Sequence, residues 1–147
     1  MRVVIQRVKK SSVKVDNKLI NEIDNGFCIL VGFTYDDTID DIKYMVNKII
    51  NLRVFDDENK VMNKSILETN GKILSISQFT LYADTKKGNR PSYIKALKSE
   101  EAIKLYNKFN EVLSENIEVK TGIFGADMQV EIQNDGPITI VIDSKNK

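Results

Sequence analysis

The sequence predicts an α/β fold in which a mixed, mostly antiparallel sheet curls into a β-barrel-like core with two main helices packed against it. Three patterns support this. About eight short segments have strand-like patterns, only two have helical spacing, and the strands fall in groups before, between and after the helices. A doubly wound parallel sheet would instead alternate strands with helices. We expect one domain over residues 1–147.

The first third of the chain predicts strands joined by turns. A first strand covers residues 3–8, and Asn17–Lys18 is typical of a turn into the next strand. Asp24–Gly26 is another turn signal, and the unbroken apolar run 27–31 after it is typical of a buried central strand. We expect Cys28 in that run to be a core residue and not a nucleophile, because apolar burial raises the pKa of a thiol.

Two segments have the spacing of amphipathic helices. The first opens at Asp37–Thr38, where Asp37 is suited to cap it, and its apolar residues recur at helical spacing as far as Ile50. The second is expected to be capped by Ser99, with two glutamates near its positive end. Between the helices, residues 53–55 predict a short strand before a polar turn.

The last third predicts strands again. Residues 117–120 alternate weakly, whereas residues 128–133 and 138–142 alternate cleanly between apolar and polar side chains. The segment 134–137 between the two clean strands contains an Asp-Gly pair, which by itself is typical of a hairpin turn. The proline after it suits the first position of a strand, where no N–H is needed for pairing.

The composition excludes several kinds of active site. The chain has no histidine, which removes triads built on imidazole and zinc sites that use it. Its single cysteine cannot form an internal disulfide, which agrees with a reducing compartment. If the chain is an enzyme, its general base is therefore a carboxylate, a lysine or a tyrosine, or it is not a protein side chain. We expect neither a metal nor a cofactor.

Charge and hydropathy limit the partners. No apolar run approaches the ~20 residues that span a bilayer, and Met1–Arg7 is too short and too alternating for a signal peptide. We expect a cytoplasmic protein that makes no membrane contact. The net charge is +1, so any nucleic-acid contact must come from a local patch. The candidates are Lys86, Lys87, Arg90, Lys95 and Lys98, which form either a solvated surface or a phosphate-contacting patch.

The chemistry is expected in residues 72–82, KILSISQFTLY. The first half predicts a buried strand. At its end, Ser77, Gln78 and Thr80 place three hydrogen-bonding side chains around Phe79. Buried polar groups without partners cost about 1–3 kcal/mol each, so such a cluster favours a bound ligand. The alternative is a polar strand end that enters a loop.

Two motifs carry a family resemblance. Ser77–Tyr82 resembles the signature of the D-aminoacyl-tRNA deacylases, and Asn134–Thr139 resembles the second signature of that family, which carries a Gly-Pro pair. Phe124–Met128 and Met1–Val8 match as well, so the resemblance covers nearly the whole chain. Arg90–Tyr93 resembles a further loop of the family, with tyrosine where phenylalanine is common. The resemblance implies the same barrel-like α/β fold, and a homodimer with the active site at the subunit interface.

The resemblance also implies an activity, which is hydrolysis of the ester of D-aminoacyl-tRNA to free amino acid and tRNA. Ser77, Gln78, Phe79 and Thr80 would form the catalytic site and hold the terminal adenosine and the aminoacyl group. Main-chain N–H groups near Phe79 could stabilise the oxyanion, with help from the 2′-OH of the substrate. The rival mechanism makes Thr80 a covalent nucleophile, which needs an adjacent base that the sequence does not place beside it.

A Gly-Pro pair with a cis peptide, here Gly136–Pro137, is implied to enter the pocket of the partner subunit and to reject L-amino acids. Glycine has no side chain to exclude, so glycyl-tRNA is also expected as a substrate. Arg7 resembles the arginine that holds this loop. The further residues that we expect at the substrate site are Met128, as pocket wall or core, Asn134 and Thr139. Asp127 is expected to cap a turn, with a general base as the alternative.

Two functions of other kinds stay open at this point. The chain could be a non-catalytic RNA-binding module that uses the basic side chains of residues 86–98. It could also be a hydrolase for some other small ester.

Overall fold

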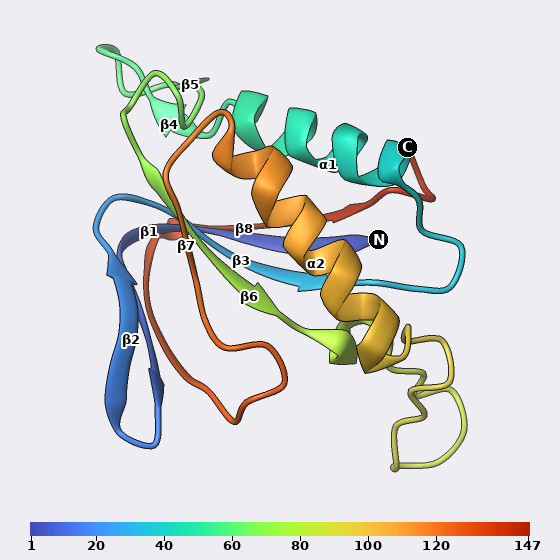
Figure 1. Ribbon diagram of the computed structural model, residues 1–147. Coiled ribbons are helices and arrows are strands. Elements are labelled where there is room, and N and C mark those ends of the chain that lie inside the picture. The colour runs from blue at the N-terminus through green and yellow to red at the C-terminus, as the bar shows by residue number, and fades with distance from the viewer.

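The computed structural model describes residues 1–147 (Figure 1). Two helices lie on one face of a strongly twisted, barrel-like mixed sheet, which confirms the predicted α/β fold class. No helix is both long enough and apolar enough to cross a membrane. The elements are β1 (Arg2–Val15), β2 (Lys18–Ile23), β3 (Gly26–Gly32), α1 (Ile39–Asn51), β4 (Phe55–Asp56), β5 (Met62–Lys64), β6 (Lys72–Ser77), the 3-10 helix η1 (Phe79–Tyr82), α2 (Ser99–Ser114), β7 (Val119–Thr121) and β8 (Gln129–Asp143).

The main sheet has the order β2–β1–β3–β6–β7, and β8 lies along the other edge of β1. β1 pairs with β2, β3 and β8 in antiparallel register, whereas β3, β6 and β7 run parallel. The turn between β1 and β2 uses Asp16 and Asn17, both with positive φ, as a tight hairpin requires. The predicted turn at Asp24–Gly26 does not reverse the chain. β2 and β3 are both antiparallel to β1, so they run in the same direction and the segment between them is only a bend.

The C-terminal third differs most from its prediction. Residues 128–133 and 138–142 are not two strands of a hairpin but the halves of one strand, β8, and both halves pair with β1. The local Asp-Gly signal is outweighed by the length of β1, whose 14 residues offer one continuous edge to the whole of β8. The residues between the halves therefore form a bulge in the strand, and the predicted turn is wrong.

Both helices begin close to the predicted places, with different caps. Thr38 is the N-cap of α1 and forms a capping box with Asp41. The predicted cap, Asp37, instead binds the N-terminal ammonium group with one carboxylate oxygen and accepts the Thr34 N–H with the other. Ser99 is the first residue of α2 and not its cap; Lys98 holds that position without a side-chain bond. The short strands β4 and β7 begin two residues later than predicted.

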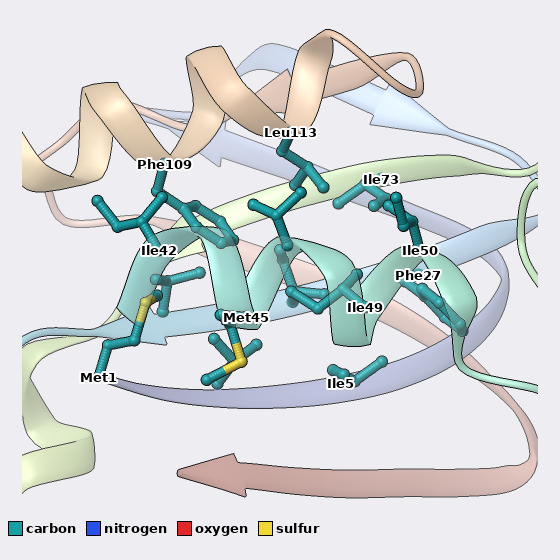
Figure 2. Close-up of a cluster of buried hydrophobic side chains, with 14 of the residues drawn as sticks. Met1, Ile5, Phe27, Ile42, Met45, Ile49, Ile50, Ile73, Phe109 and Leu113 are labelled. Carbon is teal, nitrogen blue, oxygen red and sulfur yellow. The ribbon is translucent and has the colours of Figure 1, made fainter. Parts of the chain in front are cut away.

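The larger hydrophobic core lies between the helices and the sheet. Figure 2 shows side chains of α1 and α2 directed toward those of the strands, and a fully buried aliphatic or aromatic side chain here is worth about 1.5–3 kcal/mol. A smaller core on the other face contains Cys28, which is fully buried, as predicted, and burial raises the pKa of its thiol. The labelled residues of the larger core are Met1, Ile5, Phe27, Ile42, Met45, Ile49, Ile50, Ile73, Phe109 and Leu113.

Candidate active site

A cavity of about 560 Å³ opens where β6 ends, which is within the size range of small-molecule sites. It exists because β6 and β7 separate there. Ser75 and Thr121 are the last paired residues, and the Gly122 N–H makes one more bond to the Ser75 carbonyl before the chain turns away. The walls come mainly from the end of β6, the start of α2 and the segment 124–128. Tyr106 of α2 fixes that helix to β6 by donating its hydroxyl to the Ser75 carbonyl at 2.8 Å.

A tight turn closes the end of β6. The Gln78 N–H still donates to the Val31 carbonyl of β3 at 2.7 Å, and the chain then winds into η1. This turn, residues 78–82, rests on Gly32 at the end of β3. A Cβ on Gly32 would lie 2.8 Å from the Gln78 carbonyl oxygen and 3.2 Å from the Leu81 Cβ. The turn therefore takes its position from a place where β3 has no side chain.

The turn leaves two main-chain donors unused. The N–H groups of Phe79 and Thr80 are the first two of η1, so they have no acceptor inside that helix. Neither donates to a turn or loop carbonyl elsewhere in the chain. Adjacent free N–H groups at the start of a helix, beside a cavity, are suited to bind a negatively charged oxygen.

The four predicted catalytic residues are neighbours, but they are not equivalent. Ser77, Gln78 and Phe79 line the cavity, whereas Thr80 does not. The Thr80 hydroxyl accepts a hydrogen bond from the Gln78 side-chain amide at 2.6 Å, and an amide cannot serve as a general base. Phe79 is 56 % exposed and meets Tyr93 edge to face, with 5.1 Å between the ring centres, at the rim of the cavity.

The segment 124–128 forms the opposite wall. Met128 both lines the cavity and packs against the smaller core, so the two predicted alternatives are both met. Asp127 is the one carboxylate that lines the cavity, and it is exposed. No group of three or more His, Cys, Asp or Glu side chains lies close enough together to hold a metal ion.

The basic segment 86–98 reaches this cavity only at its C-terminal end. Lys98 contributes to its lining directly. Lys95 forms an ion pair with Asp84 at 3.6 Å, which neutralises part of the segment. Lys86, Lys87 and Arg90 are exposed and form no ion pair within the chain. Their charges are therefore available to a partner.

The second motif forms the bulge of β8. Val8 pairs with Asn134 and Gln6 with Thr139, so the four residues 135–138 face Arg7 alone. The peptide bond between Gly136 and Pro137 is cis, and both residues are exposed. Gly136 has φ +121°, a conformation that residues with a side chain rarely adopt.

Arg7 fixes the base of this bulge. Its side chain is buried, and its Nε donates to the Asp135 carbonyl at 3.3 Å and lies 3.1 Å from the Asp135 carboxylate. Another bond, from Nη1 to the Val54 carbonyl, ties the guanidinium to the chain after α1. Asn134 donates to the Thr139 hydroxyl at 3.2 Å across the neck of the bulge. These contacts hold the main chain of Gly136 and Pro137 outward.

The bulge does not line the cavity of its own chain. It lies beside a sheet face that no helix covers. Val4 pairs with Leu30 and with Val141, so these three residues form an apolar row across β3, β1 and β8. Their neighbours along the strands pack toward the helices, so the row faces the other way. Val141 is 66 % exposed.

Two positions that support the turn were not predicted from the sequence. Gly32 follows a buried apolar run, and a glycine at that point is a recognised sign of close backbone approach. Arg2 donates to the Leu81 carbonyl at 3.0 Å and to the Asp143 carboxylate at 2.8 Å. No local pattern marks Arg2, because its partners lie 79 and 141 positions further along the chain.

The family model and the curated relatives identify one family. The model of the D-Tyr-tRNA(Tyr) deacylase family matches residues 4–143. A D-aminoacyl-tRNA deacylase of Bacteroides fragilis (strain YCH46) is 61 % identical over 100 % of this chain and 99 % of its own, and one of Clostridium novyi (strain NT) is 57 % identical with the same coverage. The solved structure of a protein named c-Myc DNA Unwinding Element Binding Protein is 44 % identical, with a TM-score of 0.93 over 97 % of this chain and 98 % of the other.

Proposed function

The chain belongs to the D-Tyr-tRNA(Tyr) deacylase family, and from that premise we propose that it is an esterase that hydrolyses D-aminoacyl-tRNA to free amino acid and tRNA. The observation that carries the proposal is the turn at residues 78–82, which presents two free N–H groups beside a cavity lined by Ser77, Gln78 and Phe79. A tRNA substrate agrees with a cytoplasmic location.

Hydrolysis needs little from the protein because the ester is already reactive. Water adds to the carbonyl carbon, the bond to the ribose oxygen breaks, and a proton reaches that oxygen. The neighbouring 2′-OH of the substrate is placed to pass this proton on. The N–H groups of Phe79 and Thr80 stabilise the negative oxygen, and one such donor is worth about 10²–10³ in rate. This route uses no histidine, and the chain has none.

The tRNA end is held at the rim of the cavity. The exposed ring of Phe79, supported by Tyr93, offers a surface on which a base can stack, worth about 1–3 kcal/mol. The segment that carries the unpaired charges of Lys86, Lys87 and Arg90 continues into the cavity wall at Tyr93 and Lys98, so these charges are suited to contact phosphates of the acceptor strand. Salt should therefore weaken substrate binding more than it slows cleavage.

The chiral filter comes from a second copy of the chain. The apolar row Leu30, Val4 and Val141 is suited to pack against the same row of another copy about a two-fold axis. Along β1, the bulge lies opposite Arg7 on one side of this row, and the turn lies near Arg2 on the other. A two-fold axis through the row exchanges the two ends, which brings the bulge of one copy to the turn of its partner.

In that position, the main-chain carbonyls of Gly136 and Pro137 occupy the space that an L-side chain would need. Rejection is therefore steric and polar, and it does not depend on which amino acid is bound. Glycyl-tRNA, with no side chain to exclude, is admitted. Arg7, Asn134 and Thr139 serve the filter by holding the bulge in shape.

The deciding experiment incubates the purified protein with D-tyrosyl-tRNA and with L-tyrosyl-tRNA and measures the release of amino acid. Release from the D-form alone supports the proposal. Binding without release favours a nucleic-acid-binding module built on residues 86–98, a role that agrees with the name of the 44 % identical DNA-unwinding-element binding protein. Absence of any interaction with tRNA favours a hydrolase for another small ester.

The proposed dimer has its own test. The mass in solution should be twice the 16.8 kDa of the chain. Val141→Arg buries a charge in the apolar row and should yield monomers that still fold. Lys104→Glu, at an exposed position of α2 without an ion pair, is the control and should stay dimeric. A wild-type protein that is monomeric at assay concentrations contradicts the filter.

A further inference from the structure

Arg2 connects the turn at residues 78–82 to β8, the strand on the other side of β1. Register places Arg2 between Gly32 of β3 and Asp143 of β8, so the three residues form one row across the strands. Gly32 has no side chain, which leaves the space above it to the turn. The guanidinium of Arg2 can therefore reach the turn on one side and Asp143 on the other.

The contacts of this guanidinium are specific. Nη1 donates to the Leu81 carbonyl at 3.0 Å, near the negative end of η1, where a cation is favourable. Nε donates to the Asp143 carboxylate at 2.8 Å. The carbon Cζ lies 4.6 Å from the ring centre of Tyr82, the last residue of η1. One side chain thus holds the turn by a hydrogen bond and by a cation–π contact.

The electrostatic surroundings keep these groups in the required states. Burial alone would raise the pKa of Asp143, but the hydrogen bonds from Arg2 and from the Lys145 N–H outweigh it and lower the pKa. Asp143 is therefore ionised at neutral pH. Burial raises the pKa of Tyr82, and the nearby carboxylates of Asp37 and Asp143 raise it further. The phenol stays neutral, and its ring remains a suitable partner for the cation.

We propose that Arg2 is a positioning residue for the deacylation, which sets the place of the Phe79 and Thr80 N–H groups by anchoring the last turn of η1 to β1 and β8. The proposal rests on the proposed function. Arg2 itself does not line the cavity, so it acts only through the turn. Because the alignment of such donors must hold to within a fraction of an ångström, loss of one anchor should slow the chemical step more than it weakens binding.

The test compares Arg2→Met, Arg2→Lys and the control Lys14→Met. Methionine keeps an apolar stem over Tyr82 without the guanidinium, whereas lysine keeps the charge but cannot bond both partners in the same geometry. Lys14 forms the matching ion pair between β1 and β8, with Glu131 at 2.7 Å, far along the strand from the turn. A general loosening of β1 from β8 should affect Lys14→Met and Arg2→Met alike.

For Arg2→Met we expect a single-turnover cleavage rate at least tenfold lower, with half-saturation by D-tyrosyl-tRNA changed less than twofold. The melting temperature should shift no further than in Lys14→Met. Arg2→Lys should fall between the wild type and Arg2→Met. Wild-type cleavage by Arg2→Met, or equal losses in Arg2→Met and Lys14→Met, overturns the role of Arg2. If the unsubstituted protein does not cleave, the proposed function falls and this inference with it.

A second measurement does not depend on activity. The Leu81 and Ala83 N–H groups donate within the turn, to the carbonyls of Gln78 and Thr80. If Arg2 anchors the turn, hydrogen exchange at these two amides should be about tenfold faster in Arg2→Met and unchanged in Lys14→Met. Unchanged exchange in Arg2→Met contradicts the anchor directly.

Discussion

The turn that ends β6 and the bulge inside β8 each contain a six-residue motif, yet they are supported in opposite ways. The turn packs on Gly32 and is held by Arg2, and it borders a cavity of its own chain. The bulge is held only at its base, by Arg7 and by the bond between Asn134 and Thr139, and its tip at Gly136 and Pro137 is exposed. One motif is packed against the end of β3, and the other projects outward.

This difference separates two tasks of the proposed enzyme. Cleavage needs donors at fixed positions, and a turn packed from beneath supplies them within one chain. Rejection of L-amino acids needs a rigid obstacle in the mouth of the cavity. Because the tip of the bulge lies outside the cavity of its own chain, the proposed obstacle is the bulge of a second copy. The comparison therefore predicts that damage near the turn lowers the rate, whereas damage to the bulge lowers selectivity.

The largest effect is expected from Gly32→Ala. The new Cβ would lie 2.8 Å from the Gln78 carbonyl oxygen, a main-chain atom that cannot move away without moving the turn. A displacement near 1 Å can cost about 10²-fold in rate, so we expect kcat for D-aminoacyl-tRNA to fall by about that factor. Single-turnover kinetics at saturating enzyme measure it.

The control for Gly32→Ala is Ile29→Val on the same strand. Ile29 is fully buried under the helices, so this substitution costs about 0.5–1.5 kcal/mol of stability but leaves the turn untouched. Its kcat should match that of the wild type. If both variants lose the same activity, the effect comes from stability, and the contrast between turn and bulge loses its first half.

The second effect is expected from Gly136→Ala. Gly136 has φ +121°, and an added Cβ would lie 2.9 Å from Ile138 Cγ1, so the tip of the bulge must move. We expect the D-over-L preference to fall at least tenfold, which corresponds to about 1.4 kcal/mol, while the rate on the D-substrate changes less. Paired rates on D- and L-tyrosyl-tRNA give the ratio.

Gly88→Ala is the matched control for backbone strain. Gly88 also has a positive φ, +70°, but nothing lies within 4 Å of an added Cβ, and it belongs to the basic segment and not to the bulge. Its D-over-L ratio should be that of the wild type. An unchanged ratio in Gly136→Ala would remove the bulge from the selection of handedness.

The two motifs also differ in how far the sequence predicts them. The buried run before Ser77 and the polar cluster after it are local signals, and the structure has a strand and a polar turn there. The Asp-Gly pair before Pro137 is just as local, yet it misleads. Whether such a pair makes a hairpin or a bulge depends on β1, about 130 residues away in sequence, which pairs with both halves of β8.

The supports of the turn show the same limit. Gly32 has a sequence signal, because a glycine that ends an apolar run suggests close packing of backbones. Arg2 has none, since its partners Leu81 and Asp143 come together only when three strands and the turn are assembled. Asp37 has the right type and position for a helix cap and still does not act as one, because its two carboxylate oxygens bind the N-terminal ammonium group and the Thr34 N–H.

The smallest effect is expected from Thr80→Ala, and it decides between the two mechanisms. The Thr80 hydroxyl is bonded to the Gln78 amide and has no base beside it, whereas its N–H belongs to the main chain and survives the substitution. We therefore expect cleavage of D-tyrosyl-tRNA to fall by less than about tenfold, the share of one side-chain hydrogen bond of about 0.5–1.5 kcal/mol. Thr80→Ser is the matched variant. If Thr80 were a nucleophile, Thr80→Ala would be inactive with an intact fold, Thr80→Ser would cleave, and mass spectrometry of the quenched reaction would find an aminoacyl group on the protein.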